Sequence, residues 1–394
     1  MNPIKTLRAA HGTPFYLYDG RSISAQADIL RNAFPDFTLL FSVKANPFPP
    51  VLKKMASLGI GADAASAKEV DLAAAAGIPA ENIYYSAPAP TKEDIDHVIG
   101  GCHIIADSLH ILSLLESAAA ARSLTLSVGI RLHPDFTMDG SPQAPSKFGI
   151  DASLAWDTDF AESYPHLRIV GLHVHIRSQV LDTAQLSRYY ENVLALAVKL
   201  QKHLGTALEY INFGGGIGNV YNTEKQAPLD FAALRQSVCK IKETYPLSAR
   251  LILESGRFLA CSCGTYVTEI VDIKESCGKK FYVVKNGSNG FFKPVLQQLF
   301  QPFLPKEIGT AYEPFITENE SYDIQILSGS EETEVVDIAG HLCCGTDVLA
   351  RDITVKKADI GDLVTFDHAG SYACSLAPQL FASQPAPKQI FIDE

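Results

Sequence analysis

Eight short runs rich in β-branched, aromatic and leucine residues recur between residues 38 and 254, and stretches of helical character separate most of them. Such regular alternation is typical of βαβ units, whose strands are parallel. The runs are 38–43, 60–63, 82–86, 103–106, 125–131, 169–175, 209–213 and 251–254. Eight units over about 220 residues match the number and length expected for a (β/α)8 barrel. A doubly wound open sheet could use the same alternation, and periodicity alone does not choose between them.

Two of the intervening helices have recognisable ends. Ser66 and Glu69 form a capping-box pattern that opens an alanine-rich run, and Gly77 ends this run. Asp182 can cap a longer helix whose apolar positions recur at helical spacing, with Gly205 just past its end. These signals predict helices between the strands and support the α/β class.

The pattern changes after Gly256. From Thr265 onward, alternating runs are separated by Gly, Pro and Asp, and the one short helical candidate is 294–299. This pattern favours an antiparallel β domain, either a sandwich or a barrel. The N-terminal strand candidate 15–19 could pair into it. We therefore predict a barrel at 22–257 and a β domain formed by 1–21 and 258–394.

Composition excludes several classes of protein. Apolar residues make up 47% and charged residues 20%, which is ordinary for a soluble globular chain. No run of eighteen apolar residues occurs, and the first twenty residues lack the apolar segment of a secretory signal. The net charge of −11 opposes non-specific binding to nucleic acid or anionic membranes. The eight cysteines show no paired CxxC spacing, so we expect no metal site and a cytoplasmic location.

Polar residues fall where the predicted strands end. Lys44 follows the first run, Asp63 ends the second, His175 ends the sixth, glycines 214–216 follow the seventh and Glu254 ends the eighth. The carboxyl ends of barrel strands meet at one mouth, where chemistry takes place. Each residue alone has an ordinary explanation, such as a solvated strand end or a tight turn. Adjacent glycines also let backbone N–H groups approach a phosphate. The combination predicts an active site at the mouth.

Seven ordered motifs, spread from about residue 12 to residue 390, resemble the fold type III decarboxylases that depend on pyridoxal 5'-phosphate (PLP). The motifs are VKAN, GADAAS, GLHVHIRSQ, NFGGGIG, ESGR, GHLCCGTDVLARD and AGSY. This family includes the diaminopimelate, ornithine and arginine decarboxylases. The resemblance implies a PLP-binding barrel, a C-terminal β domain, and a homodimer whose active sites are shared between the two subunits.

The resemblance also implies roles for individual residues. Lys44 looks like the lysine that binds PLP covalently, and Glu254 like the carboxylate that hydrogen-bonds the pyridine nitrogen. His175 resembles the imidazole stacked on the ring, and Asp63 a polar group near the aldimine side of the cofactor. Glu69 is a weaker match because helix capping explains it equally well. The expected phosphate ligands are Ser178, Gly214, Gly215, Gly216, Gly256, Arg257 and Tyr372.

Cys343 matches the family's cysteine that reaches the active site of the partner subunit and returns a proton to the substrate Cα after CO2 is lost. Without its GHLCCGTD context, a buried structural thiol would be the default interpretation. Three nearby positions depart from the family pattern. Cys344 stands where an acidic residue usually grips the distal amine, Arg177 replaces a glycine, and Lys285 replaces an acidic residue. We therefore expect Arg177 and Cys344 to contact substrate and to favour an anionic one.

Three longer segments, ESGRFLACSCGTYVTEIVDIK, GHLCCGTDVLARD and SQPAPKQIFI, look like decarboxylases of carboxylate-siderophore pathways of the staphyloferrin B type. Those enzymes act on a citryl-diaminopropionate intermediate. Three alternatives remain. One is a diaminopimelate or other diamino-acid decarboxylase. A racemase on the same barrel is disfavoured by Glu254, because the family's racemases pair the ring nitrogen with arginine. A catalytically silent homologue that binds a regulatory partner is disfavoured by the presence of both Lys44 and Cys343.

Overall fold

The structure is a computed structural model that describes residues 3–141, 144–303 and 313–393. The chain divides into two compact units. The first, here called the barrel unit, comprises Ser24–Gly218 and Pro228–Gly256; the second, the β unit, comprises Met1–Ile23, Asn219–Ala227 and Arg257–Glu394. The predicted barrel ran without interruption from 22 to 257, whereas the short segment 219–227 groups with the β unit.

Eight parallel strands form a closed ring in the barrel unit. Along the ring, β5 pairs with β4, then β3, β2, β10, β9, β8 and β6, and the pairing of β6 with β5 completes the circle. The strands are β2 (Phe37–Ser42), β3 (Gly61–Ala64), β4 (Ile83–Tyr85), β5 (His103–Ala106), β6 (Leu126–His133), β8 (Leu167–His173), β9 (Tyr210–Asn212) and β10 (Arg250–Ser255). The short β7 (Ile150–Asp151) pairs with β6. The predicted barrel is confirmed, and the open-sheet alternative is wrong.

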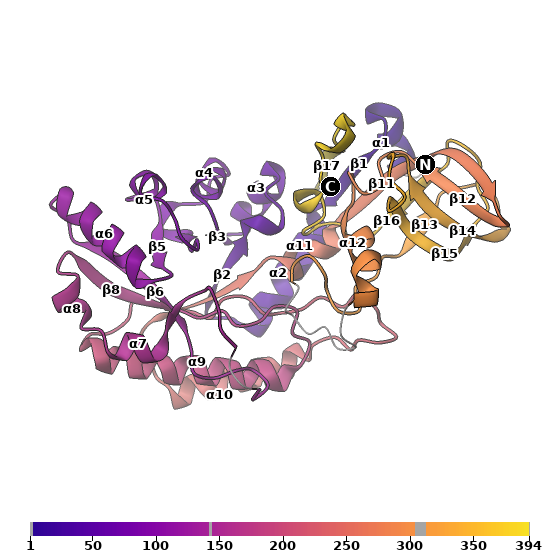
Figure 1. Cartoon of the computed structure of the whole chain (residues 1–394). Helices are drawn as coiled ribbons and strands as arrows, with labels where there is room; N and C mark the ends of the chain where they lie inside the picture. Colours follow the sequence, from indigo (N-terminus) through magenta and orange to yellow (C-terminus); the bar gives the residue numbers. More distant parts are fainter. Residues whose placement is uncertain (1–2, 142–143, 304–312, 394) are drawn as a thin grey trace. The chain divides into compact units, whose positions relative to one another are not determined.

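Helices lie outside the strand ring (Figure 1). They are α3 (Pro49–Ser57), α4 (Ala67–Ala75), α5 (Lys92–Val98), α6 (Leu109–Ala121), α7 (Ala152–Trp156), α8 (Phe160–Ser163), α9 (Thr183–Leu204) and α10 (Phe231–Thr244), and α2 (Gly20–Ala33) precedes the first barrel strand. The Asp182 carboxylate accepts two N–H groups at the start of α9, and Gly205 ends this helix at φ +67°. Ser66 accepts the Glu69 N–H at the start of α4. The Asp182 cap is confirmed, and so is the Ser66 half of the capping box, whereas the Glu69 carboxylate accepts the N–H of Ala65 instead of that of Ser66.

An apolar layer fills the barrel interior. Its members are Leu40, Tyr84, Ile105, Val170, Tyr210 and Ile252. The Tyr210 ring lies against Gly171, where a Cβ would overlap the ring, so the missing side chain on β8 makes room for one of the two tyrosines of the layer. Because this layer is apolar, the buried polar side chains of the barrel gather instead at the carboxyl ends of the strands.

The β unit contains one eight-stranded sheet. Its main path runs β13, β16, β11, β12, β14 and β15, and β1 pairs with both β11 and β17. The strands are β1 (Phe15–Asp19), β11 (Gly264–Ser276), β12 (Lys279–Val284), β13 (Ile324–Ile326), β14 (Thr333–Gly340), β15 (Val348–Lys356), β16 (Leu363–Phe366) and β17 (Lys388–Ile392). The unit also carries α1 (Pro3–His11), α11 (Arg257–Ala260) and α12 (Lys293–Phe300).

The predicted class of the second domain is confirmed with one difference. Most strand pairs are antiparallel, including β1 with β11, which brings the N-terminal strand candidate into this sheet. However, β12 pairs with β14 and β1 pairs with β17 in parallel. The sheet is therefore mixed. In the ranges that the structure describes, no helix is both long and apolar enough to cross a membrane.

Candidate active site

Lys44 and Asp63 lie side by side at the mouth of the barrel. Lys44 sits in the short 3-10 turn Val43–Ala45 directly after β2, and Asp63 lies on the neighbouring β3. Their Nζ and Oδ2 atoms are 3.3 Å apart, with the lysine side chain 50% exposed and the aspartate 3%. Burial raises the pKa of Asp63, and the charge of Glu254 adds to this, while Lys44 opposes it. The pair presents an accessible amine beside a buried carboxyl group.

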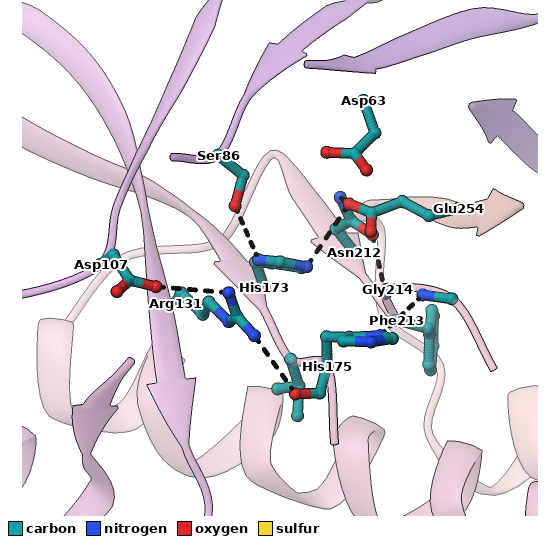
Figure 2. Close-up of polar contacts among 12 residues, drawn as sticks. Asp63, Ser86, Asp107, Arg131, His173, His175, Asn212, Phe213, Gly214 and Glu254 are labelled. Carbon is teal, nitrogen blue, oxygen red and sulfur yellow. Dashed lines mark hydrogen bonds and ion pairs between the residues drawn. The ribbon is translucent and has the colours of Figure 1, made fainter. Parts of the chain in front are cut away.

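Glu254, on β10, is the centre of a buried polar cluster (Figure 2). Asn212 donates from Nδ2 to its Oε1 at 2.7 Å, and His173 Nε2 lies 3.4 Å from the same oxygen. These three residues come from the adjacent strands β8, β9 and β10. Burial alone would raise the pKa of Glu254, but attraction to His173 and Lys44 outweighs burial and lowers it. The carboxylate is therefore ionised at neutral pH.

Asn212 connects this carboxylate to the glycine turn. Its Oδ1 accepts the Gly214 N–H at 2.9 Å, which orients the amide so that Nδ2 faces Glu254. Gly214 has φ +64°, and a Cβ there would overlap the carbonyl oxygen of Val174 and the side chain of His175. The first glycine is therefore needed for the tight turn itself.

His175 lies just past the end of β8 and is held as a neutral imidazole. The Gly215 N–H donates to its Nδ1 at 3.1 Å, and Ser178 Oγ lies 3.5 Å from its Nε2. Burial and the nearby charge of Arg131 lower the pKa of His175 to about 3. Since Nδ1 accepts a hydrogen bond, the proton is on Nε2. A flat, uncharged ring with a fixed tautomer is the result.

Five members of this cluster were not among the residues expected from the sequence: Ser86, Asp107, Arg131, His173 and Asn212. Arg131 Nη1 lies 3.4 Å from the Asp107 carboxylate, and its Nη2 lies 3.5 Å from the His175 carbonyl oxygen (Figure 2). Ser86 Oγ lies 3.5 Å from His173 Nδ1. All five stand at or near the carboxyl ends of barrel strands. Examining the end of every strand, including β4, β5 and β6, would have found them.

Two other expected residues lie in the barrel unit. Arg177 pairs with Asp139 at 3.1 Å, and the two side chains are 27% and 41% exposed. The Arg177 carbonyl oxygen would lie 3.3 Å from a Cβ on Gly216, so this arginine is close to the glycine turn. Glu69 accepts the Ala65 N–H at 2.7 Å, and burial raises its pKa. Its contacts are those of a helix-capping residue.

Arg257 and Tyr372 belong to the β unit. The buried Arg257 donates from Nη1 to the Tyr221 hydroxyl at 2.8 Å and forms an ion pair with Glu313. Its guanidinium carbon is 5.1 Å from the centre of the Tyr372 ring. Tyr372 has φ +54°, an unusual backbone conformation for an aromatic residue. The side chain of Arg257 is therefore already engaged, whereas Gly256 directly before it ends the barrel unit.

Cys343 and Cys344 lie in the turn that joins β14 to β15. The Cys343 side chain is exposed and Cys344 is half-buried. Both belong to the β unit, whereas Lys44 belongs to the barrel unit. The expected residues thus form two groups, one at the barrel mouth and one in the β unit.

Comparison with known proteins agrees with this geometry. The family model of the pyridoxal-dependent decarboxylase pyridoxal-binding domain matches residues 20–261. A diaminopimelate decarboxylase of Aquifex aeolicus is 28% identical, over 99% of this chain and 89% of its own length. An L-glutamyl-(BtrI acyl-carrier protein) decarboxylase of Niallia circulans is 31% identical, over 98% of this chain and 90% of its own.

Solved structures are similar over the whole chain. The diaminopimelate decarboxylase of M. jannaschii in complex with L-lysine has a TM-score of 0.86 and 26% identity, covering 99% of this chain and 89% of its own. The match of the pyridoxal-binding model to more than half of the chain, together with a relative above 30% identity, shows the family. The chain belongs to the fold type III PLP-dependent decarboxylases, the family of the ornithine, arginine and diaminopimelate enzymes, and is a carboxy-lyase that uses pyridoxal 5'-phosphate.

Proposed function

We propose that this protein removes the amino-acid carboxylate of a carboxylate-rich conjugate, of the citryl-diaminopropionate kind found in siderophore biosynthesis, and that it does so as a cytoplasmic homodimer. The observation that carries the substrate class is Arg177, an arginine beside the glycine turn whose partner is a partly exposed aspartate. The decarboxylase chemistry follows from the family. The residue roles below are proposals argued from the contacts of the barrel mouth.

The residues at the barrel mouth fit PLP. Lys44 offers an accessible amine for the covalent bond to the cofactor aldehyde, and Asp63 is its buried counter-ion. The ionised Glu254 suits a pyridine nitrogen, which needs an anionic acceptor to stay protonated. A neutral His175 could lie against a cationic ring without repulsion, whereas a protonated imidazole would be repelled by the ring. When bound, PLP supplies an electron sink for the pair left at Cα by loss of CO2.

The hydrogen bonds of the glycine turn indicate which of its three N–H groups is available to the phosphate. Gly214 and Gly215 already donate their N–H groups to Asn212 and His175. We therefore assign the Gly216 N–H to the phosphate, with the Ser178 hydroxyl, the backbone of Gly256–Arg257 and the Tyr372 hydroxyl. The first two glycines instead shape the turn and orient the side chains around the ring.

We assign protonation of the substrate Cα to Cys343, reaching the barrel mouth of the partner subunit. Its exposed thiol is accessible to a second chain, and a thiol can donate a proton as a general acid. Each active site would then combine Lys44 of one chain with Cys343 of the other. A two-fold symmetric dimer contains two such sites.

The charge balance supports an anionic substrate. Arg177 pairs with a partly exposed Asp139, so a substrate carboxylate can replace this partner without stranding a buried charge. By contrast, the buried cations Arg257 and Lys293 of the β unit have buried carboxylate partners, Glu313 and Glu320. The proposal therefore depends on Arg177 more than on a general excess of positive charge.

Cys344 supports the same conclusion because it cannot hold an ammonium group by charge. A conjugate whose distal amine is acylated needs no such partner. The relative from Niallia circulans is, by its name, a decarboxylase of a glutamyl group attached to a carrier protein, which is also a conjugated amino acid. Decarboxylation of conjugated amino acids is thus found among relatives of this chain.

Diaminopimelate is the second candidate substrate. Diaminopimelate decarboxylases of several organisms are 26–29% identical to this chain over nearly its full length. Diaminopimelate also carries a second carboxylate that Arg177 could hold. The two candidates differ in their distal amine, which is free in diaminopimelate and acylated in the conjugate.

CO2 release decides between them. The purified holoenzyme is offered citryl-diaminopropionate, meso-diaminopimelate, L-ornithine and L-glutamate. We expect the highest kcat/KM with the citryl conjugate and a loss of about tenfold or more in Arg177→Gly, mostly in KM. Arg168→Ala is the matched control, because this exposed arginine pairs with Glu209 near the opposite ends of the strands. Preference for meso-diaminopimelate, or an unchanged KM in Arg177→Gly, would overturn the substrate assignment.

A further inference from the structure

The turn that carries Cys343 is built around one buried carboxylate. β14 and β15 form an antiparallel hairpin, and residues 341–347 connect them. Asp347, at the end of this connection, is 2% exposed. Its Oδ2 accepts the Leu342 N–H at 2.9 Å from the opposite end of the same turn. The Asp347 main chain closes the turn as well, accepting the Gly340 N–H at 2.8 Å.

The same carboxylate holds a second loop. Its Oδ1 accepts the Ser288 N–H at 2.6 Å, from the segment after β12. Because β12 and β14 are parallel neighbours, with Val284 opposite Gly340, the segments that follow them leave the sheet at the same edge. Asp347 lies between these two segments and uses one oxygen for each.

Two glycines make room for this arrangement. A Cβ at Gly287 would overlap Oδ1 of Asp347, and a Cβ at Gly340 would overlap Oδ2. The carboxylate is thus enclosed by backbone from both segments, with one glycine on each side. When a carboxylate accepts two buried N–H groups, losing these hydrogen bonds is costly because the donors are left unpaired.

We infer that Asp347 is a positioning residue that fixes the turn 341–346 and thereby the place from which Cys343 delivers its proton. The contacts in the turn support this. The Asp347 N–H donates to the Cys344 carbonyl oxygen at 3.2 Å, and Leu342 is buried while Cys343 is exposed. The Asp347 carboxylate therefore holds Leu342, the residue before the cysteine pair, while the Asp347 main-chain N–H holds the carbonyl oxygen of Cys344. The functional part of this inference rests on the role proposed for Cys343.

Asp347→Asn tests the inference, with Asp337→Asn as the matched control. Asp337 is also a buried carboxylate of this sheet, and it accepts the Asp352 N–H at 2.8 Å, away from the cysteine turn. An amide can keep one of the two hydrogen bonds of Asp347 but turns an N–H toward the other donor. Both variants lose a buried carboxylate of the same sheet. Asp337 is paired with Lys279 and Arg351, whereas Asp347 holds the two backbone segments at the cysteine turn.

The first measurement is amide hydrogen exchange of the holoenzyme, followed by mass spectrometry. Asp347→Asn should increase exchange about tenfold in peptides covering Ser288 and residues 341–346, the size expected when one charge-assisted hydrogen bond is lost. Asp337→Asn should instead increase exchange near Asp352. If exchange in the turn is unchanged in Asp347→Asn, the inference that Asp347 holds this turn is wrong, whatever the role of Cys343.

The second measurement is turnover of the substrate selected by the CO2 screen, run in D2O. Asp347→Asn should lower kcat about tenfold with KM changed less than about twofold, and should reduce the stereochemical purity of deuterium at the product Cα. Asp337→Asn should retain both. Faster exchange in the turn with unchanged kcat and stereochemistry would overturn the positioning role. If Cys343→Ala keeps full activity, Cys343 is not the proton donor. The exchange measurement still tests separately whether Asp347 holds the turn.

Discussion

Two groups of buried charges, one in each unit, are paired differently. In the described part of the β unit the buried cations Arg257 and Lys293 each have a buried carboxylate partner, and Lys293 Nζ lies 2.7 Å from Glu320 with both side chains at most 2% exposed. At the barrel mouth the buried carboxylates Asp63 and Glu254 lie near the half-exposed Lys44, whereas the neighbouring Arg131 and Asp107 form a buried pair of their own. We call a buried ion pair such as Lys293–Glu320 a closed pair, because each charge already has its partner in the folded structure. We call Asp63, Glu254 and Lys44 the open cluster, because two buried carboxylates at strand ends face one accessible amine, an arrangement suited to a charged ligand. Burial of charge alone therefore does not mark a functional site.

Lys44→Ala should have the largest effect, because it removes the accessible amine from the open cluster. We expect kcat to fall on the order of 10⁴-fold or more. Borohydride reduction followed by peptide mass spectrometry should find a phosphopyridoxyl group on Lys44 in the wild type and none at position 44 in the variant. Lys199→Ala, on the outer helix α9, is the control and should keep both activity and label. Residual labelling at another lysine with full activity would rule out the assignment.

Glu254→Gln should lower the decarboxylation rate by about 10²- to 10⁴-fold, since an amide cannot keep the pyridine nitrogen protonated. Single-turnover kinetics with saturating PLP separates this effect from weaker cofactor binding. Glu209→Gln, which changes an exposed carboxylate near the opposite ends of the strands, should behave like the wild type. A near-normal rate in Glu254→Gln would mean that the carboxylate is only structural.

Lys293→Met breaks a closed pair and should affect stability rather than chemistry. Leaving Glu320 buried without its cation should cost about 3–5 kcal/mol of unfolding free energy, measured by urea denaturation. The double variant Lys293→Met/Glu320→Gln should recover part of this loss. If Lys293→Met instead keeps its stability and loses substrate affinity, the pair belongs to the substrate site and the contrast between the two units fails.

A smaller effect is expected from acid. The pKa of His175 is about 3 in the folded protein and near 6.5 in the unfolded chain, so the unfolded chain binds the extra proton between these values. The stability that a neutral His175 provides is complete above pH 6.5 and is lost as pH falls toward 3. At pH 5 the loss is about 2 kcal/mol. His175→Gln should remove this part of the difference between unfolding at pH 7 and pH 5; an unchanged difference would contradict a neutral imidazole.

The fold of the barrel unit could be predicted from sequence because its strands are buried on both faces and therefore appear as short apolar runs between helices. All eight runs correspond to strands with ends shifted by two residues or fewer. The strand-end rule also identified Lys44, Asp63, Glu254 and the glycine turn. We applied this rule only to residue types that commonly take part in catalysis, so it missed Asn212. The importance of Asn212 comes from its hydrogen bond to Glu254 on the adjacent strand.

The β unit was less predictable. Parallel pairing of β12 with β14 depends on a connection that periodicity does not encode. The partner of Arg257 is Glu313, 56 residues away, and no local pattern links them. Asp347 looks like an ordinary loop aspartate until the hydrogen bonds to Ser288 and Leu342 are known. Contacts between distant loops must be seen in three dimensions.

The central claim is that an active site joins the barrel mouth of one chain to the cysteine turn of another. Mixing Lys44→Ala and Cys343→Ala protomers tests it directly, because each heterodimer has one site with both changes and one with neither. After verified subunit exchange, random pairing gives half heterodimers, so activity should recover to about a quarter of the wild-type value. No recovery above the level of the separate variants would place Cys343 outside the partner's site and contradict the shared active site.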